Sequence, residues 1–150
     1  MKTIFNPADK NEILNRIDKL TPESKALWGK MNVAQMLAHS ANAAKMPTGE
    51  ISVKGVGFPI SILGKVFKPM VLKGGDMRKN SPTSPEIKVT DPCDFRKEKE
   101  NFINAFNKLG DMQEKAVKND KHPFFGKMRP AEWGRINYIH ADHHLKQFGV

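Results

Sequence analysis

Cysteine and two of the three aromatic residue types are scarce in this chain of 150 residues, which contains one Cys, one Tyr and two Trp. The single cysteine, Cys93, excludes an intramolecular disulfide and any zinc site or iron–sulfur cluster that needs several cysteines of one chain. A chain of this length buries roughly 70% of its unfolded surface, so we predict one domain, residues 1–150, that folds without a structural metal. A metal ion bound by this domain would therefore serve its function.

Long apolar runs are also missing from the sequence. The N-terminal segment turns polar before an apolar signal core develops, and no later run approaches the roughly 20 apolar residues that span a bilayer. These absences argue against a secretory signal and against transmembrane helices. We therefore expect a cytoplasmic protein with no membrane partner.

Positive charge is in excess, with 25 Lys and Arg against 16 Asp and Glu and a formal net charge of +9. Such an excess is typical of nucleic-acid binding, because cationic side chains neutralise phosphates and release counterions. The distribution argues against this function, since the lysines are scattered and no basic stripe is interleaved with aromatic residues. We predict a solvated basic surface and no nucleic-acid partner.

Apolar residues recur at helical spacing in four segments. Asn6 is a typical N-terminal cap for the first segment, and Asn32 is a candidate cap for the second. The third and fourth segments keep one face apolar among charged residues, as amphipathic helices do. The predicted helices cover residues 7–20, 33–46, 94–118 and 130–148.

Residues 47–93 differ from the rest of the chain, because they hold six of its ten prolines and six of its eleven glycines. This composition predicts a long crossover, with one short helix over residues 59–72 and a loop over 73–88. A turn is expected at residues 122–126, and no segment alternates convincingly as a strand does. We therefore predict an all-α protein, an up-and-down four-helix bundle with one long crossover between its helices 2 and 3.

The five histidines are the most informative residues of the sequence. At 100° per residue, His140 and His144 project from one face of the last predicted helix, about one turn apart, which suits chelation of a single ion. That face also carries apolar residues, so we expect the pair to point into the bundle. On the second predicted helix, His39 likewise lies on the face expected to meet the core.

Three inward imidazoles need a common explanation, because each buried neutral histidine must satisfy two ring nitrogens and burial of its charged form costs stability. One metal ion explains all three, and a three-His site with an open coordination position is typical of catalytic metal centres. The alternative is that they are ordinary core residues, since pairs of histidines at i and i+4 also occur without metal. Sequence spacing alone leaves both interpretations open.

Four short motifs are spread along the chain outside the crossover: LWGKM at 27–31, NVAQMLAH at 32–39, HPFFGKM at 122–128 and YIHADHHLKQFG at 138–149. Their combination resembles the DinB/YfiT-like superfamily of four-helix, metal-dependent proteins, and within it an uncharacterised branch. The resemblance implies that a divalent metal, zinc or nickel, is held by His39, His140 and His144. It also implies a thiol-dependent transferase or a hydrolase, and a homodimer.

Three further residues are candidates for roles near this site. Gln35, one turn before His39, is a candidate to orient a ligand or a bound water, with ordinary core-edge polarity as the alternative. His143 is a candidate proton shuttle or metal-site partner, with a packed flank residue as the alternative. Cys93 precedes the third predicted helix and is a candidate reactive thiol, although a lone cysteine is more often inert.

The sequence thus predicts a metal-dependent enzyme that activates a thiol or a water molecule against a small-molecule electrophile. An S-transferase that uses a low-molecular-weight thiol needs fewer additional acid–base groups than a hydrolase. The alternative is a non-catalytic metal- or ligand-binding module that serves a stress response. Three imidazoles suit zinc, nickel, copper and iron alike, so the sequence does not select the metal.

Overall fold

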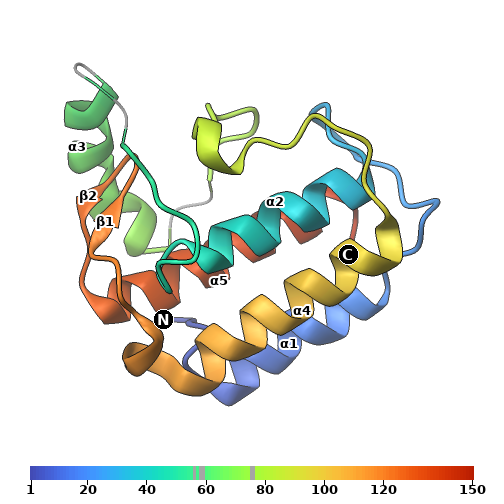
Figure 1. Cartoon of the computed structure of the whole chain (residues 1–150), viewed down its shortest axis with the longest axis horizontal. Coiled ribbons are helices and arrows are strands. Elements are labelled where there is room, and N and C mark those ends of the chain that lie inside the picture. Colours follow the sequence, from blue (N-terminus) through green and yellow to red (C-terminus); the bar gives the residue numbers. More distant parts are fainter. Residues whose placement is uncertain (56, 58–59, 75–76) are drawn as a thin grey trace.

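Helices make up most of the chain in the computed structural model, which describes all residues except 56, 58–59 and 75–76 (Figure 1). The described α-helices are α1 (Pro7–Asp18), α2 (Val33–Lys45), α3 (Ile60–Leu72), α4 (Phe95–Met112) and α5 (Pro130–Gln147). The smaller elements are the 3₁₀ helices η1 (Pro85–Ile87) and η2 (Gln113–Ala116) and the antiparallel strands β1 (Lys121–His122) and β2 (Gly126–Lys127). The predicted all-α class is confirmed.

Both caps predicted from the sequence are formed. The side-chain oxygen of Asn6 accepts hydrogen bonds from the backbone N–H groups of Ala8 (2.9 Å) and Asp9 (3.3 Å), at the start of α1. Asn32 and Gln35 form a reciprocal capping box at the start of α2, in which each side chain accepts from the other residue's backbone N–H. These caps fix where each helix begins and therefore which residues of α2 face the core.

The helices α1, α2, α4 and α5 enclose the larger apolar core. α2 contacts α4 and α5, and α1 contacts the same two helices. The core residues include Ile13, Ile17, Met36, Leu37, Phe102, Phe106, Leu109 and Leu145. α3 and the β1–β2 hairpin lie together beside one end of these helices (Figure 1). Among the described residues, no helix combines the length and the apolarity that crossing a bilayer requires.

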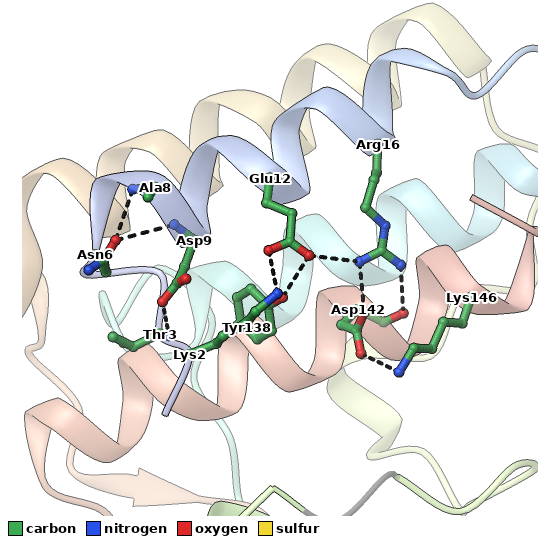
Figure 2. A network of polar contacts seen from close by, with 10 residues as sticks. All are labelled: Lys2, Thr3, Asn6, Ala8, Asp9, Glu12, Arg16, Tyr138, Asp142 and Lys146. Carbon is green, nitrogen blue, oxygen red and sulfur yellow. Dashed lines mark hydrogen bonds and ion pairs between the residues drawn. The ribbon is translucent and has the colours of Figure 1, made fainter.

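Polar contacts tie α1 to the face of α5 that carries Tyr138 and Asp142 (Figure 2). Arg16 of α1 donates to the Asp142 carboxylate at 2.7 Å and to the backbone carbonyl of Val150 at 2.8 Å. One turn earlier on each helix, the Tyr138 hydroxyl donates to Glu12 at 3.1 Å. These bonds fix the rotation of α5, so that its opposite face, with the two histidines, points toward α2.

The structure corrects the expected bounds of two helices. The helix expected over residues 94–118 ends at Met112, because Gln113 adopts a φ of 51° and the chain continues as the 3₁₀ helix η2. The helix expected over 7–20 ends at Asp18. A positive φ at a residue other than glycine has no clear sequence signal, which explains the longer prediction for α4.

The crossover and the turn also contain more structure than expected. The 3₁₀ helix η1 lies within the predicted loop 73–88, of which residues 75–76 are outside the described part. The short helix expected over 59–72 is α3, and its expected first residue is likewise not described. The turn expected at 122–126 is a hairpin with two-residue strands, which are too short to show alternation in the sequence.

Candidate metal centre

A cavity of about 1100 Å³ runs along α5, with α2 beside it and the crossover as its outer wall. Trp28 and Gln147 line the cavity near the end of α5, whereas Phe125 of the hairpin and Trp133 line it near the start of that helix. The crossover contributes Ile87 of η1 and the residues around it. Three histidines from α2 and α5 lie between these two ends.

His39, His140 and His144 form one cluster, in which one ring nitrogen from each lies within 4.8 Å of the others. The Nε2 atoms of His39 and His140 are 3.0 Å apart. Each pair of ring centroids is separated by 4.6 to 4.9 Å. The helical spacing of His140 and His144 therefore places both side chains toward α2, as the sequence predicts, and the fold brings His39 to them across 101 residues.

The backbone of the crossover fixes the proton on His39. Its Nδ1 lies 2.9 Å from the carbonyl oxygen of Ile87, and a carbonyl oxygen can only accept a hydrogen bond. Nδ1 therefore carries the hydrogen, and Nε2, which points into the cluster, has a free lone pair. This is the tautomer that a metal ligand needs, with the second ring nitrogen held by a backbone carbonyl.

Gln147 fixes His144 in the same way. The Gln147 Nε2 group donates to the carbonyl of Trp28 at 2.6 Å, which turns its Oε1 toward His144. That oxygen lies 2.8 Å from His144 Nδ1 and accepts its hydrogen. The lone pair of His144 is thereby left on Nε2. Two of the three imidazoles are thus oriented by bonds that are characteristic of the surroundings of metal ligands.

Burial keeps the three imidazoles uncharged. His39 and His144 are 3% and 7% exposed, and His140 is half-buried against the cavity. Desolvation lowers the pKa of His39 below the ordinary value of 6.5 and lowers the pKa of His144 to about 3. Desolvation, followed by the nearby histidines, lowers the pKa of His140 well below 6.5. At neutral pH all three are in the form that binds a metal ion.

The spacing of the cluster fits a divalent ion. Zn–N bonds of 2.0–2.1 Å place two nitrogens on one tetrahedral ion about 3.3 Å apart, close to the separation of His39 and His140. The widest separation, 4.8 Å, would close by about 1.5 Å in such a site. Three neutral imidazoles are a donor set that zinc, nickel, copper and iron accept. The cluster can therefore hold a metal ion, and its chemistry does not select which one.

The residues predicted to surround the metal lie on the cavity wall. Gln35 donates from Nε2 to the carbonyl of Thr90 at 3.0 Å and thus fastens the end of the crossover to α2. The ring of His143 is centred 5.2 Å from the ring of His144 and 5.9 Å from that of Trp28. A role for either side chain beside a metal stays a prediction.

Cys93 lacks the features of a reactive thiol. Its Sγ donates to the carbonyl of Asp91 at 3.4 Å. Burial, with smaller contributions from nearby carboxylates, raises the pKa of the thiol above 9.0. The cysteine is therefore protonated at neutral pH, which favours the inert alternative.

Sequence reasoning did not assign the two groups that orient the imidazoles. Gln147 carries a signal, because it follows His144 by three residues and so lies on the same face of α5. The carbonyl of Ile87 carries none, since every residue has a carbonyl and only the path of the crossover brings this one to His39.

Comparison with known proteins identifies a family. The model of the family described as "Protein of unknown function (DUF1569)" matches residues 5–149, nearly the whole chain. Neither the curated proteins nor the solved structures yield a match. The match takes in both helices that supply the three histidines, α2 and α5. The chain belongs to the DUF1569 family.

Proposed function

We propose that the protein is a metal-dependent enzyme in which His39, His140 and His144 hold one zinc or nickel ion. The observation that carries the proposal is the pair of outward hydrogen bonds, from His39 to Ile87 and from His144 to Gln147, which leave two Nε2 lone pairs inside the cluster. When bound, the ion supplies a Lewis acid that lowers the pKa of a water or thiol at its open coordination position.

The chain's own residues would hold the metal ion and shield the reacting groups from water. Three protein ligands leave an open position, and the half-buried His140 lies where the cavity reaches the cluster. Apolar side chains of α3 and the hairpin, such as Phe67 and Phe125, line the same cavity and exclude water from part of it. The arrangement suits a small, largely apolar substrate.

A thiol nucleophile is favoured over water by the composition of the wall. Among the described residues that line the cavity, none is Asp or Glu, so no carboxylate is at hand to serve as a general base. Hydrolysis of a stable bond needs a general base and would have to use a histidine of the wall such as His143. A thiolate instead attacks an electrophilic carbon and displaces a leaving group with little further help. We therefore propose an S-transferase that uses a low-molecular-weight thiol, with a hydrolase as the second reaction type.

Several wider expectations stay proposals. The contacts of α1, α2, α4 and α5 with one another support a four-helix bundle of the DinB/YfiT-like kind. The cluster of one histidine from α2 and two from α5 supports the same assignment. We also propose a homodimer, from the resemblance alone, and a cytoplasmic location, from the sequence.

Metal content tests the first step of this proposal. We expect untagged protein to contain close to one equivalent of zinc or nickel by mass spectrometry, and the His140→Ala/His144→Ala variant to contain almost none. His143→Ala is the matched control, because it removes the neighbouring imidazole and leaves the cluster intact. Wild-type protein that stays metal-free after addition of zinc and nickel would remove the chemical basis of the proposal.

Turnover tests the second step. Protein loaded with metal is incubated with a small thiol and an aryl halide, and conjugate formation is compared with that of the cluster variant. We expect conjugation that depends on the metal, and ester hydrolysis assayed in parallel separates the two reaction types. Full metal occupancy with neither reaction would instead favour a non-catalytic metal- or ligand-binding module.

A further inference from the structure

The loop between α1 and α2 contains the LWGKM motif, residues 27–31, whose role the proposed function does not explain. Two hydrogen bonds tie this loop to the last residue of α5. The backbone N–H of Leu27 donates to the carbonyl oxygen of Gln147 at 2.8 Å, and the Gln147 side-chain amide donates to the carbonyl oxygen of Trp28 at 2.6 Å. The second bond turns Gln147 Oε1 toward His144. The path of the loop therefore decides how His144 is held.

Gly29, the third residue of the motif, has a backbone conformation that favours glycine. Its φ of 84° lies in the left-handed region, which other residues adopt only with strain. This conformation by itself does not connect Gly29 to the cluster, because Gly49 has a φ of 79° and lies outside the described lining of the cavity. An alanine at either position costs stability through the backbone. Loss of stability alone therefore assigns neither glycine to the site.

The space beside Gly29 distinguishes the two glycines. A Cβ at position 29 would lie 2.5 Å from Gln147 Nε2, which is closer than nonbonded atoms approach, and 3.9 Å from Asn80 Oδ1 of the crossover. At position 49 the nearest atom to an added Cβ is the Cβ of Lys118 at 3.6 Å, an ordinary van der Waals contact. The backbone of Gly29 thus lies against the amide of Gln147 at a place where no side chain fits.

A side chain at position 29 would act on the cluster through Gln147. The amide of Gln147 is the end of a flexible side chain, so its movement relieves the collision at lower cost than movement of the loop backbone. That movement would break the bond to the Trp28 carbonyl and draw Oε1 away from His144 Nδ1. His144 would then lose the acceptor that keeps its hydrogen on Nδ1. A hydrogen on Nε2 instead would remove the lone pair that faces the cluster.

We infer that Gly29 is a positioning residue of the histidine cluster. Because it has no side chain, the Trp28 carbonyl can hold Gln147, and Gln147 holds His144 in the tautomer that binds a metal ion. The effect of Gly29 on metal affinity rests on the proposed function, whereas its effect on the tautomer of His144 does not. The LWGKM loop then belongs to the metal site, although it supplies no ligand.

The tautomer of His144 is measured in metal-free protein, where it reports the position of the Gln147 amide. Long-range ¹H–¹⁵N NMR spectra distinguish a ring nitrogen that carries a hydrogen from one that does not. We expect wild-type protein to carry the hydrogen on Nδ1 of both His39 and His144. In Gly29→Ala, His144 should lose this preference, and His39 should keep it because the Ile87 carbonyl still holds it. Gly49→Ala, the matched control, should leave both rings unchanged.

Zinc affinity is the second measurement, made by competition with a chromophoric chelator. Gly29→Ala should bind zinc about 10- to 100-fold more weakly than wild type, and Gly49→Ala should stay within about twofold. Gln147→Ala removes the amide and leaves room for a Cβ at position 29. Adding Gly29→Ala to it should therefore weaken zinc binding by less than about twofold further. If Gly29→Ala alone fails to fold, the double variant should fold, because the collision is gone.

The inference is overturned if His144 keeps its hydrogen on Nδ1 in Gly29→Ala, or if Gly49→Ala shifts the tautomer as strongly. It is equally overturned if Gly29→Ala and Gln147→Ala weaken zinc binding independently, or if the double variant also fails to fold, since Gly29 then serves the fold alone. Protein that binds no zinc and still shows the change of tautomer in Gly29→Ala would refute the proposed metal-dependent function and keep the role of Gly29.

Discussion

The Gln147→Leu substitution tests whether the cluster is built to hold a metal ion. Gln147 is 4% exposed and joins His144 Nδ1 to the carbonyl of Trp28 through one side chain. Leucine has a similar volume and removes both hydrogen bonds. His144 then loses the group that keeps its hydrogen on Nδ1, and its ring is free to turn and to adopt the other tautomer.

Two effects follow, one on metal affinity and one on the stability of the metal-free protein. Loss of a hydrogen-bond partner behind a metal-bound histidine lowers metal affinity about 10- to 100-fold, which corresponds to about 1.4–2.7 kcal/mol. Separately, a buried donor of His144 and a buried acceptor of Trp28 lose their partner. We expect the metal-free variant to lose about 2 kcal/mol of unfolding free energy, or roughly 4–8 °C in melting temperature.

Zinc affinity is measured by competition with a chromophoric chelator, and stability by urea unfolding of the metal-free protein. Gln35→Leu is the matched control, because Gln35 is also a cavity-lining glutamine whose side chain both accepts and donates a hydrogen bond. Its partners are the backbone of Asn32 and of the crossover, not a histidine of the cluster. We expect this control to lose stability and to keep zinc affinity within about twofold of wild type.

Two outcomes would refute the reasoning. If Gln147→Leu loses stability as expected and binds zinc as tightly as wild type, Gln147 only supports the fold. If Gln35→Leu weakens zinc binding as strongly as Gln147→Leu does, the sequence-based expectation for Gln35 is the better description of the site.

Two further predictions concern the fold around the cavity. His122 has a folded pKa of about 3 against 6.5 when unfolded, so its neutral form contributes stability that is complete above pH 6.5 and is lost as pH falls toward 3. Urea unfolding of metal-free protein between pH 6.5 and 5 should show a slope to which His122 contributes up to about 1.4 kcal/mol per pH unit, with His39, His140 and His144 contributing in the same direction. A flat profile would contradict this prediction. Gly64→Ala should loosen α3, because a Cβ there would collide with the carbonyl of Phe124. The strain should cost about 1–3 kcal/mol of unfolding free energy and should accelerate hydrogen exchange of the α3 amides. Gly57→Ala is the control and should match wild type, because a Cβ at position 57 would meet no atom within 4 Å.

The sequence predicted those parts of the site that depend on local geometry. Asn32 caps α2 as expected, and the four-residue spacing of His140 and His144 places both rings on one face of α5. His39 was assigned to the inner face of its helix, although periodicity gave no distance to the other two. The motif resemblance joined the three residues, and the structure brings them within 4.8 Å.

The parts that the sequence did not predict depend on tertiary placement. The bond from His39 to Ile87 joins a side chain to a backbone carbonyl of the crossover, which no pattern marks. The end of α4 at Met112 follows from the backbone conformation of one glutamine, Gln113. The contact between His122 and Trp133 arises because the hairpin brings together two residues that have no helical relationship.

The two ring nitrogens of His39 link the histidine cluster to the crossover. Nδ1 binds the crossover at Ile87, and Nε2 faces the cluster. A cation on Nε2 withdraws electron density from the imidazole and makes the Nδ1 hydrogen a stronger donor to the Ile87 carbonyl. Thermodynamic reciprocity then requires that docking of the crossover raise the affinity for the cation by the same factor. Whatever lifts η1 from α2 would therefore lower the affinity of the three histidines for a metal ion.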